Sequence, residues 1–285
     1  MKSKFEKAVT FAGGHARLCR YAELQNLPHW HREHELVFVE QGKVTLMTDG
    51  NLFTLEQGDT AFLHSEEPHS LCSENGAVVA VVKLDKEQFR RLLDNRKLQS
   101  PVLCPVSGIG DALRLLQAEQ RRADAYSADV IDCTVTRLLV EILRHNPLTE
   151  PGQRNDATEN YKALLDRIAR DYAYVTFDEA AEMMHFSRPY FSRYFYKHTG
   201  MSFTRYLNTI RISVAVEQLL QGGVTVTEVS QSCGFNTIRN FNRVFKEMTG
   251  YTPGTLPRDY SFACNLHRNG EGGFDPTLGC TVVLE

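Results

Sequence analysis

An internal repeat in the second half of the chain constrains the fold more than any other sequence feature. The segment "FDEAAEMMHFSRPYFSRYFYKHTG" at 177–200 returns as "VTEVSQSCGFNTIRNFNRVFKEMTG" at 226–250. Each copy has the pattern of a helix, a short turn and a second helix that carries two phenylalanines four residues apart. A repeated unit of this kind predicts an all-α domain with two helix–turn–helix motifs.

The stretch between the copies, "SFTRYLNTIRISVAVEQLLQG", predicts one long helix over residues 202–221. Ser202 is a suitable N-cap, and Gly222 suits the C-terminal end. A helix of about 20 residues spans about 30 Å. That length suits two helices held about one DNA turn apart, ~34 Å, in adjacent major grooves.

The second helix of each copy presents polar and basic residues opposite its phenylalanines. Arginine and asparagine make paired hydrogen bonds to base edges, and lysine neutralises phosphates. Residues 159–260 carry 12 Lys and Arg against 10 Asp and Glu. The indication of a DNA partner therefore comes from these local faces and not from the total charge. Ser187 in the first copy, and Asn236 or Thr237 in the second, can N-cap these helices.

Residues 159–260 resemble the DNA-binding domain of the AraC/XylS family of transcription regulators. The resemblance begins with Ala181, Ser187 and the "FSRYF" of the first copy. It continues through "YLNTIRISVAVEQLL" and "GFNTIRNFNRVFKEMTGYTP" and ends at Arg258. Pro257 replaces an aromatic residue that is usual in the family, which puts the end of the last helix in question.

The resemblance implies a sequence-specific transcription regulator that binds double-stranded DNA and senses a small molecule, and not an enzyme. A homodimer is also expected and, for an activator, contact with RNA polymerase. Seven helices are expected, with motifs at about 176–200 and 226–250. The expected DNA contacts are Arg188, Pro189, Ser192, Arg193, Ile238, Arg239, Asn242, Arg243 and Lys246. Arg193 and Arg243 are alternatively phosphate contacts.

Short strands separated by turns predict a small β-barrel or sandwich within residues 1–100. In "HELVFVEQGKVTLMTDGNLFTLEQGDTAFLH" apolar runs are broken by QG, DG and QGD turns, and Asp49-Gly50 is a hairpin signal. "GAVVAVVKL" adds one more strand. The fold class is therefore multidomain α+β, with an N-terminal barrel and a C-terminal all-α domain.

Residues 101–146 have helical apolar spacing, and we expect them to mediate dimerisation. The alternative is that their apolar stripe packs on its own barrel. The stripe contains Val135, Leu138, Leu139 and Ile142. A linker rich in proline, glycine and polar residues follows at 147–158, and the Gly-rich tail at 261–285 is expected to be poorly ordered.

The stretch "PHWHREHELVFV" at 28–39 crowds three histidines and two glutamates before an apolar run. It resembles the first motif of the cupin barrels in His29, His31, Glu35 and Gly42. The second cupin motif is matched by Gly58, His64 and His69. The departures, where proline, glycine and asparagine are usual, are His64, Glu66 and Ser73. The resemblance implies a cupin-like barrel that senses an effector.

In a metal-binding cupin the corresponding ligands would be His29, His31, Glu35 and His69. Three imidazoles and one carboxylate suit a divalent transition metal such as Fe, Mn, Zn or Ni. The alternative is a polar pocket in which the same four residues hydrogen-bond a hydroxylated effector such as a sugar. Trp30 is expected to pack outside the barrel, because neighbours in a strand point to opposite sides. His34 is expected to be exposed.

The chain shows no sequence sign of secretion or of a membrane span. The start "MKSKFEKAVT" is charged with no apolar run after it, and no stretch approaches roughly 18 apolar residues. Seven cysteines without a CxxC pair suggest reduced thiols, so a cytoplasmic location is expected.

Two other functions compete with that of a regulator. The four cupin positions favour a metal-dependent enzyme such as a dioxygenase or isomerase, but such an enzyme has no use for a double helix–turn–helix region. A helical interaction scaffold does not explain the repeated basic faces. The sequence therefore favours a transcription regulator.

Overall fold

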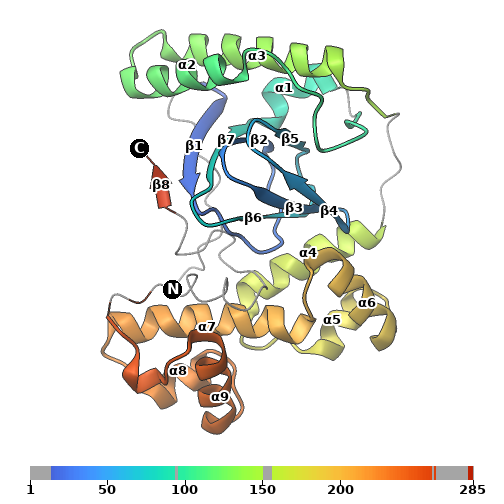
Figure 1. Cartoon of the computed structure of the whole chain (residues 1–285). Coiled ribbons are helices and arrows are strands. Elements are labelled where there is room, and N and C mark those ends of the chain that lie inside the picture. The colour runs from blue at the N-terminus through green and yellow to red at the C-terminus, as the bar shows by residue number, and fades with distance from the viewer. Residues whose placement is uncertain (1–13, 94–95, 150–155, 259, 261–281, 285) are drawn as a thin grey trace.

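The structure is a computed structural model of the 285-residue chain, and it describes residues 14–93, 96–149, 156–258, 260 and 282–284. The N-terminal half forms two antiparallel sheets around an apolar core, and helices lie above and below it (Figure 1). The sheets have the strand orders β5-β2-β7-β1-β8 and β4-β3-β6. The strands are β1 Ala16–Ala22, β2 His34–Gln41, β3 Val44–Thr48, β4 Asn51–Leu55, β5 Thr60–Leu63, β6 His69–Ser73, β7 Val78–Leu84 and β8 Val282–Leu284.

Strand β2 is covered on both of its faces. Val37 and Val39 point into the core between the sheets, whereas Leu36 and Phe38 belong to a second core under the helices. This alternation follows from the two-residue period of a strand. The predicted hairpin at Asp49-Gly50 is confirmed between β3 and β4. Both turn residues have positive φ, 48° and 68°, as a two-residue hairpin turn with matched twist requires.

Three helices cover the outer face of the five-stranded sheet: α1 Lys86–Leu93, α2 Ile109–Arg122 and α3 Ser127–His145. The apolar stripe of α3 lies in this core, and its members are at most 6% exposed: Val135, Leu138, Leu139 and Ile142. The expectation that this stripe mediates dimerisation is therefore wrong, and the alternative, packing on its own barrel, is confirmed. The homodimer itself stays a prediction.

The C-terminal domain consists of α4 Asp156–Asp171, α5 Phe177–Met183, α6 Arg188–Thr199, α7 Phe203–Gln221, α8 Val226–Ser232, α9 Ile238–Thr249 and the 3₁₀ helix η1 Pro253–Thr255. Helix α4 begins inside the segment predicted as a linker, and its first turn is acidic, which suits the positive end of a helix dipole. The resemblance implied seven helices. The described part of this domain has six α-helices followed by η1, and Pro257, which lacks an N–H donor, does not extend a helix there.

The long helix α7 joins two separate apolar cores. Its N-terminal half, with Phe203, Tyr206 and Leu207, packs with α4, α5 and α6. Its C-terminal half, with Ile212 and Val216, packs with α8 and α9. As predicted, Ser202 caps this helix by accepting a hydrogen bond from the Arg205 amide. The helix therefore acts as the shared wall of two small bundles.

The two bundles begin and end in the same way. Thr176 and Thr225 each form a capping box, with Glu179 and Glu228 respectively. Thr237 caps α9 through its side chain, whereas Ser187 stands at the N-cap of α6 without a side-chain hydrogen bond. Gly200 and Gly250 end α6 and α9 in the left-handed conformation that favours glycine.

The tail expected to be poorly ordered lies outside the described residues over 261–281 and at 285. Its residues 282–284 form β8, which pairs with β1, so the expectation does not hold for these three. Across the described ranges, no helix combines the length and apolar character that crossing a bilayer requires.

Candidate functional site

The barrel brings together all four residues that the cupin resemblance singled out. His29 and His69 exchange two backbone hydrogen bonds, of 3.0 and 2.9 Å. Their ring centroids lie 4.5 Å apart, and the ring of His31 lies 5.1 Å from that of His69. One ligand nitrogen from each of the three rings lies within 4.8 Å of the other two. We call His29, His31, His69 and Glu35 the histidine cluster.

Each ring of the cluster is oriented by a backbone carbonyl. Nδ1 of His29 lies 2.8 Å from the Leu27 oxygen, and Nδ1 of His31 lies 3.1 Å from the Glu33 oxygen. Nδ1 of His69 lies 2.7 Å from the carbonyl oxygen two residues before it. A carbonyl only accepts, so Nδ1 is the donor in each ring.

Glu35 lies on the inner face of β2 and contacts two of these rings. Its Oε1 is 2.9 Å from Nε2 of His31, and its Oε2 is 3.4 Å from Nε2 of His69. Lys83 Nζ lies 3.5 Å from Oε1. Burial opposes ionisation of this carboxyl, but the charges of His31 and Lys83 and the contacts with both rings outweigh it and hold the Glu35 pKa well below its usual range. Glu35 is therefore a carboxylate.

Lys83 is a member of the site that the sequence analysis missed. It is 5% exposed and pairs across the strands with Glu35. The available signal was a single charge inside the apolar run of β7. His29, by contrast, is kept neutral: burial, followed by the nearby His69 and His31, lowers its pKa well below the usual value.

A second pair of histidines lies on the other side of β2 and does not join the cluster. His34 is 6% exposed, so the expectation that it is exposed is wrong. It shares its strand face with Leu36, and this face is covered by helices. The ring stacks on Phe62, and its Nδ1 accepts from the Ser65 amide. His64 Nε2 accepts from the backbone, and burial lowers the pKa of both histidines to about 3.

Residues 27–31, which we call the connecting segment, touch the cluster on one side and the helical domain on the other. Leu27 lies in the apolar core formed by α4–α7. Tyr206 on α7 donates a 3.0 Å hydrogen bond to the Pro28 carbonyl, and Trp30 Nε1 donates to the Lys162 carbonyl at 3.3 Å. The interpretation of Trp30 as packing outside the barrel is confirmed by its contact with α4.

An ion pair reinforces this junction. Lys162 Nζ lies 3.3 Å from Glu66 of the barrel and 4.9 Å from the Trp30 ring centroid. Glu66 also pairs with Lys86 at 2.8 Å. Its φ of 63° explains why glycine is usual at this cupin position. The departure from the cupin pattern therefore supplies a contact with the helical domain.

The nine residues expected to contact DNA are all exposed on α6 and α9. Arg188 pairs with Asp178 at 2.9 Å, and Arg243 pairs with Glu247 at 2.9 Å. Both pairs are more than half exposed, so water screens them and their exchange for phosphate or base contacts costs little. The DNA contacts themselves stay a prediction.

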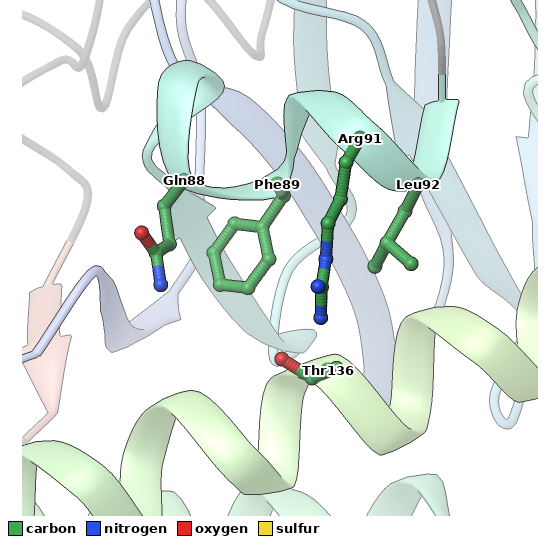
Figure 2. A pocket seen from close by; sticks show the side chains of 5 residues that line it. All are labelled: Gln88, Phe89, Arg91, Leu92 and Thr136. Atoms are coloured by element: carbon green, nitrogen blue, oxygen red, sulfur yellow. The ribbon is translucent and has the colours of Figure 1, made fainter.

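A hollow elsewhere on the barrel does not involve the histidine cluster. It lies between α1 and α3, where the α1 side chains point toward α3 (Figure 2). Its lining consists of Gln88, Phe89, Arg91, Leu92 and Thr136. None of these five residues belongs to a motif that the sequence indicated. Arg91 is the charged residue among them.

Comparison with known proteins matches both halves of the chain. Residues 20–132 match the family model of an AraC-like ligand binding domain, and residues 180–259 match that of a helix-turn-helix domain. The HTH-type transcriptional activator RhaS of Salmonella typhimurium is 28% identical over 243 residues, which is 79% of this chain and 85% of the relative. RhaS of Salmonella arizonae is 26% identical over 240 residues, with the same shares.

Solved structures are similar at lower identity. Fatty-acid-bound ToxT from Vibrio cholerae covers 84% of this chain and 93% of its own, with 13% identity and a TM-score of 0.42. The C-terminal domain of the response regulator yesN from Fusobacterium nucleatum covers 34% of this chain and 95% of its own, with 26% identity and a TM-score of 0.32.

Proposed function

This chain belongs to the AraC family of DNA-binding transcription regulators, and on that premise we propose that α6 and α9 read DNA while the histidine cluster holds the effector. Its relatives are transcriptional activators and not enzymes, and its N-terminal half is a ligand-binding domain. The proposal concerns which residues act, what they bind and how the two halves communicate.

The observation that carries the DNA proposal is the placement of α6 and α9 at opposite ends of α7, each with an exposed polar face. With 19 residues, α7 is about 28 Å long, close to the roughly 34 Å of one DNA turn. The test is selection of the tightest duplex from a random pool, followed by footprinting. Protection of two adjacent major-groove segments is expected. A single protected segment would contradict reading by both helices.

We propose that the effector is a small hydroxylated molecule such as a sugar. Imidazole and carboxylate groups offer both donors and acceptors for hydroxyl groups, and they lie together at one end of the barrel. A thermal-shift screen of sugars and related metabolites, with and without divalent cations, tests this. A hit should lose its effect in His31→Ala and in Glu35→Ala. If both variants respond like the wild type, the effector binds elsewhere.

We propose that the connecting segment carries the signal. His29 and His31 contribute to the cluster, while the residues between and before them contact α4 and α7. Tyr206→Phe removes the hydrogen bond to Pro28 and should reduce the effector's influence on DNA affinity by at least about fivefold. DNA affinity without effector should change less. Tyr260→Phe, in the second bundle, is the matched control.

The proposal also covers the oligomeric state, the direction of regulation and the cellular location of the protein. A homodimer would have to use surface other than the buried α3 stripe, and Leu115 on α2 is a candidate because it is 41% exposed. Light scattering at micromolar concentration tests it. The relatives are transcriptional activators, which favours activation by this protein as well and hence contact with RNA polymerase. Action on DNA favours a cytoplasmic location.

A further inference from the structure

We propose that the hollow between α1 and α3 is a second ligand site, and that it takes a small monocarboxylic acid with an apolar body. Arg91, Gln88 and Thr136 hold the carboxylate of this acid, and its apolar body lies against Phe89 and Leu92 (Figure 2). The two helices cover the outer face of the five-stranded sheet, so the site is separate from the histidine cluster. It does not rest on the sensor role proposed for that cluster.

The lining comes from one face of α1 and from one residue of α3. Gln88, Arg91 and Leu92 stand three and four residues apart, so their side chains emerge on the same face of α1. Figure 2 shows these side chains pointing toward α3, where Thr136 presents its hydroxyl. Phe89 is 2% exposed and anchors α1 in the apolar core above the sheet. The two helices thus hold a guanidinium, an amide and a hydroxyl around one space.

Arg91 is a cation without a counterion in the described part of the chain. Its neighbour Arg90 pairs with Glu87 at 3.6 Å, and Asp132 on α3 holds the ring of His15 at 2.6 Å. No described residue forms an ion pair with Arg91 itself. A guanidinium presents five N–H donors in a planar fork that matches a carboxylate. An anion is therefore the ligand group that suits this part of the hollow.

The hydroxyl of Thr136 is placed differently from those of Thr134 and Thr249, which also stand inside helices. Each of those two donates to the carbonyl oxygen four residues before it, at 2.7 Å. Within the described ranges, neither the Thr136 hydroxyl nor the Gln88 side-chain amide has a hydrogen-bond partner. Both groups can donate, and the five lining residues include no carboxylate. An ionised carboxylate, which only accepts, complements such a lining.

The charge and size of the hollow narrow the class of acid. A single guanidinium balances one negative charge, whereas a dianion would leave one charge without a partner. Phe89 and Leu92 add carbon surface to the lining. The hollow has a volume of about 310 Å³, at the lower end of the range for small-molecule sites. A monocarboxylate with a short chain or a single ring fits all three properties.

The experiment uses the full-length protein and two probes, hexanoate and 3-phenylpropionate. Calorimetry at constant ionic strength measures binding, and the melting temperature is recorded in parallel. We expect one site per chain, with a Kd of about 1 mM or lower for these ligands of roughly ten non-hydrogen atoms. The melting temperature should rise with the concentration of either acid.

Two further probes test the two halves of the ligand separately. Hexanamide keeps the apolar chain and lacks the charge, whereas inorganic phosphate keeps the charge and lacks the apolar body. Each should bind at least about tenfold more weakly than hexanoate.

Two pairs of matched variants locate the site. Arg91→Gln removes the lining cation and should weaken hexanoate binding by at least about tenfold. Arg90→Gln removes the neighbouring cation, which is already paired, and should change binding by less than about twofold. Thr136→Val removes the hydroxyl that faces the hollow and should weaken binding about three- to tenfold. Thr134→Val is its control, because that hydroxyl is bonded within its own helix.

The fold of each variant is checked by circular dichroism. Arg91 is exposed, so its substitution is compatible with the fold. His31→Ala changes the histidine cluster and should bind hexanoate like the wild type. Weaker binding in that variant would place the acid inside the barrel and overturn the proposal.

Three other results would also overturn it. They are the absence of saturable hexanoate binding up to about 10 mM, a lining variant that binds as well as its matched control, and hexanamide or phosphate binding as tightly as the acid. DNA affinity and the sugar screen are measured on the same wild-type protein. The proposed regulator function can therefore stand while this site falls, and the reverse also holds.

Discussion

Each helix–turn–helix unit has its own core, but the core of the first, residues 176–200, includes Leu27 of the N-terminal half, whereas the core of the second, residues 225–250, contains helical-domain residues. Lys197 of the first unit lies so close to Gly50 that a Cβ there would be 2.9 Å from its Cε, and Met47 reaches Gly200. The core of the second unit is formed by residues of α7, α8 and α9, and Leu256 and Tyr260 pack against it. One backbone design thus appears in two settings, and the first setting can pass a signal from the barrel.

The largest effect on stability should come from truncating the core phenylalanine that the two units share. Phe195→Ala and Phe245→Ala each remove a fully buried ring and should each cost about 3–5 kcal/mol of local stability. Hydrogen exchange should then rise in the connecting segment for Phe195→Ala but not for Phe245→Ala. If the segment responds equally to both, the two units do not differ in their coupling to the barrel.

Removing the two matched arginines that we propose to contact DNA should have the next largest effect. Arg188→Ala and Arg239→Ala should each weaken the best selected duplex by about 1–3 kcal/mol and relax base preference locally. The effector should change the loss of DNA affinity caused by Arg188→Ala and leave the loss of DNA affinity caused by Arg239→Ala unchanged. Lys246→Ala is the control, and it should weaken all sequences alike. Wild-type binding by both arginine variants would show that other residues read the bases.

The matched caps should give a smaller and equal effect. Thr176→Ala and Thr225→Ala each remove a capping box of the same geometry, at a cost of about 0.5–2 kcal/mol. Chemical denaturation measures both. If both variants lose the same free energy of unfolding, the different coupling of the two units to the barrel arises from α6 and its surroundings. A much larger cost for one cap would mean that α5 or α8 also differs.

The smallest effect concerns pH. Burial lowers the pKa of His198 below its usual value, more than the Asp49 carboxylate of the barrel raises it. The unfolded chain then binds the proton more readily, so stability falls as the pH drops below about 6.5. His198→Met copies the second unit, which has Met248 there.

When the pH is lowered from about 7.5 to about 5.5, the melting temperature of His198→Met should fall less than that of the wild type. His34 and His64 contribute equally in both proteins. If the melting temperature falls equally in both proteins, the pKa of His198 is not lowered by folding.

The elements with local signals were predicted well from the sequence. Thr237, Ser202 and Gly222 mark helix ends through hydrogen bonds within a few residues of themselves, and Asp49-Gly50 forms its turn without distant help. Such signals depend on short stretches of backbone. The doubled helix–turn–helix could therefore be recognised without knowing how its halves pack.

Three of the misses depend on long-range packing. His34 was expected to be exposed. It lies on the strand face opposite to Glu35, and helices cover that face. The stripe through Leu138 was expected to form a dimer interface, although it packs on the barrel. The sequence shows that a helix face is apolar, but it does not show which surface buries that face. Lys83 was missed because its partner lies on another strand. The cluster itself was predicted from the cupin resemblance, which already encodes the neighbouring strands.

The two-sided connecting segment has a thermodynamic consequence. Any ligand of the histidine cluster that changes DNA affinity through Leu27, Pro28 and Trp30 must have its own affinity changed by DNA, by the same factor. A tenfold effect corresponds to about 1.4 kcal/mol in either direction. An operator site would thus set the concentration at which the barrel fills, and the same protein would have different thresholds at different promoters.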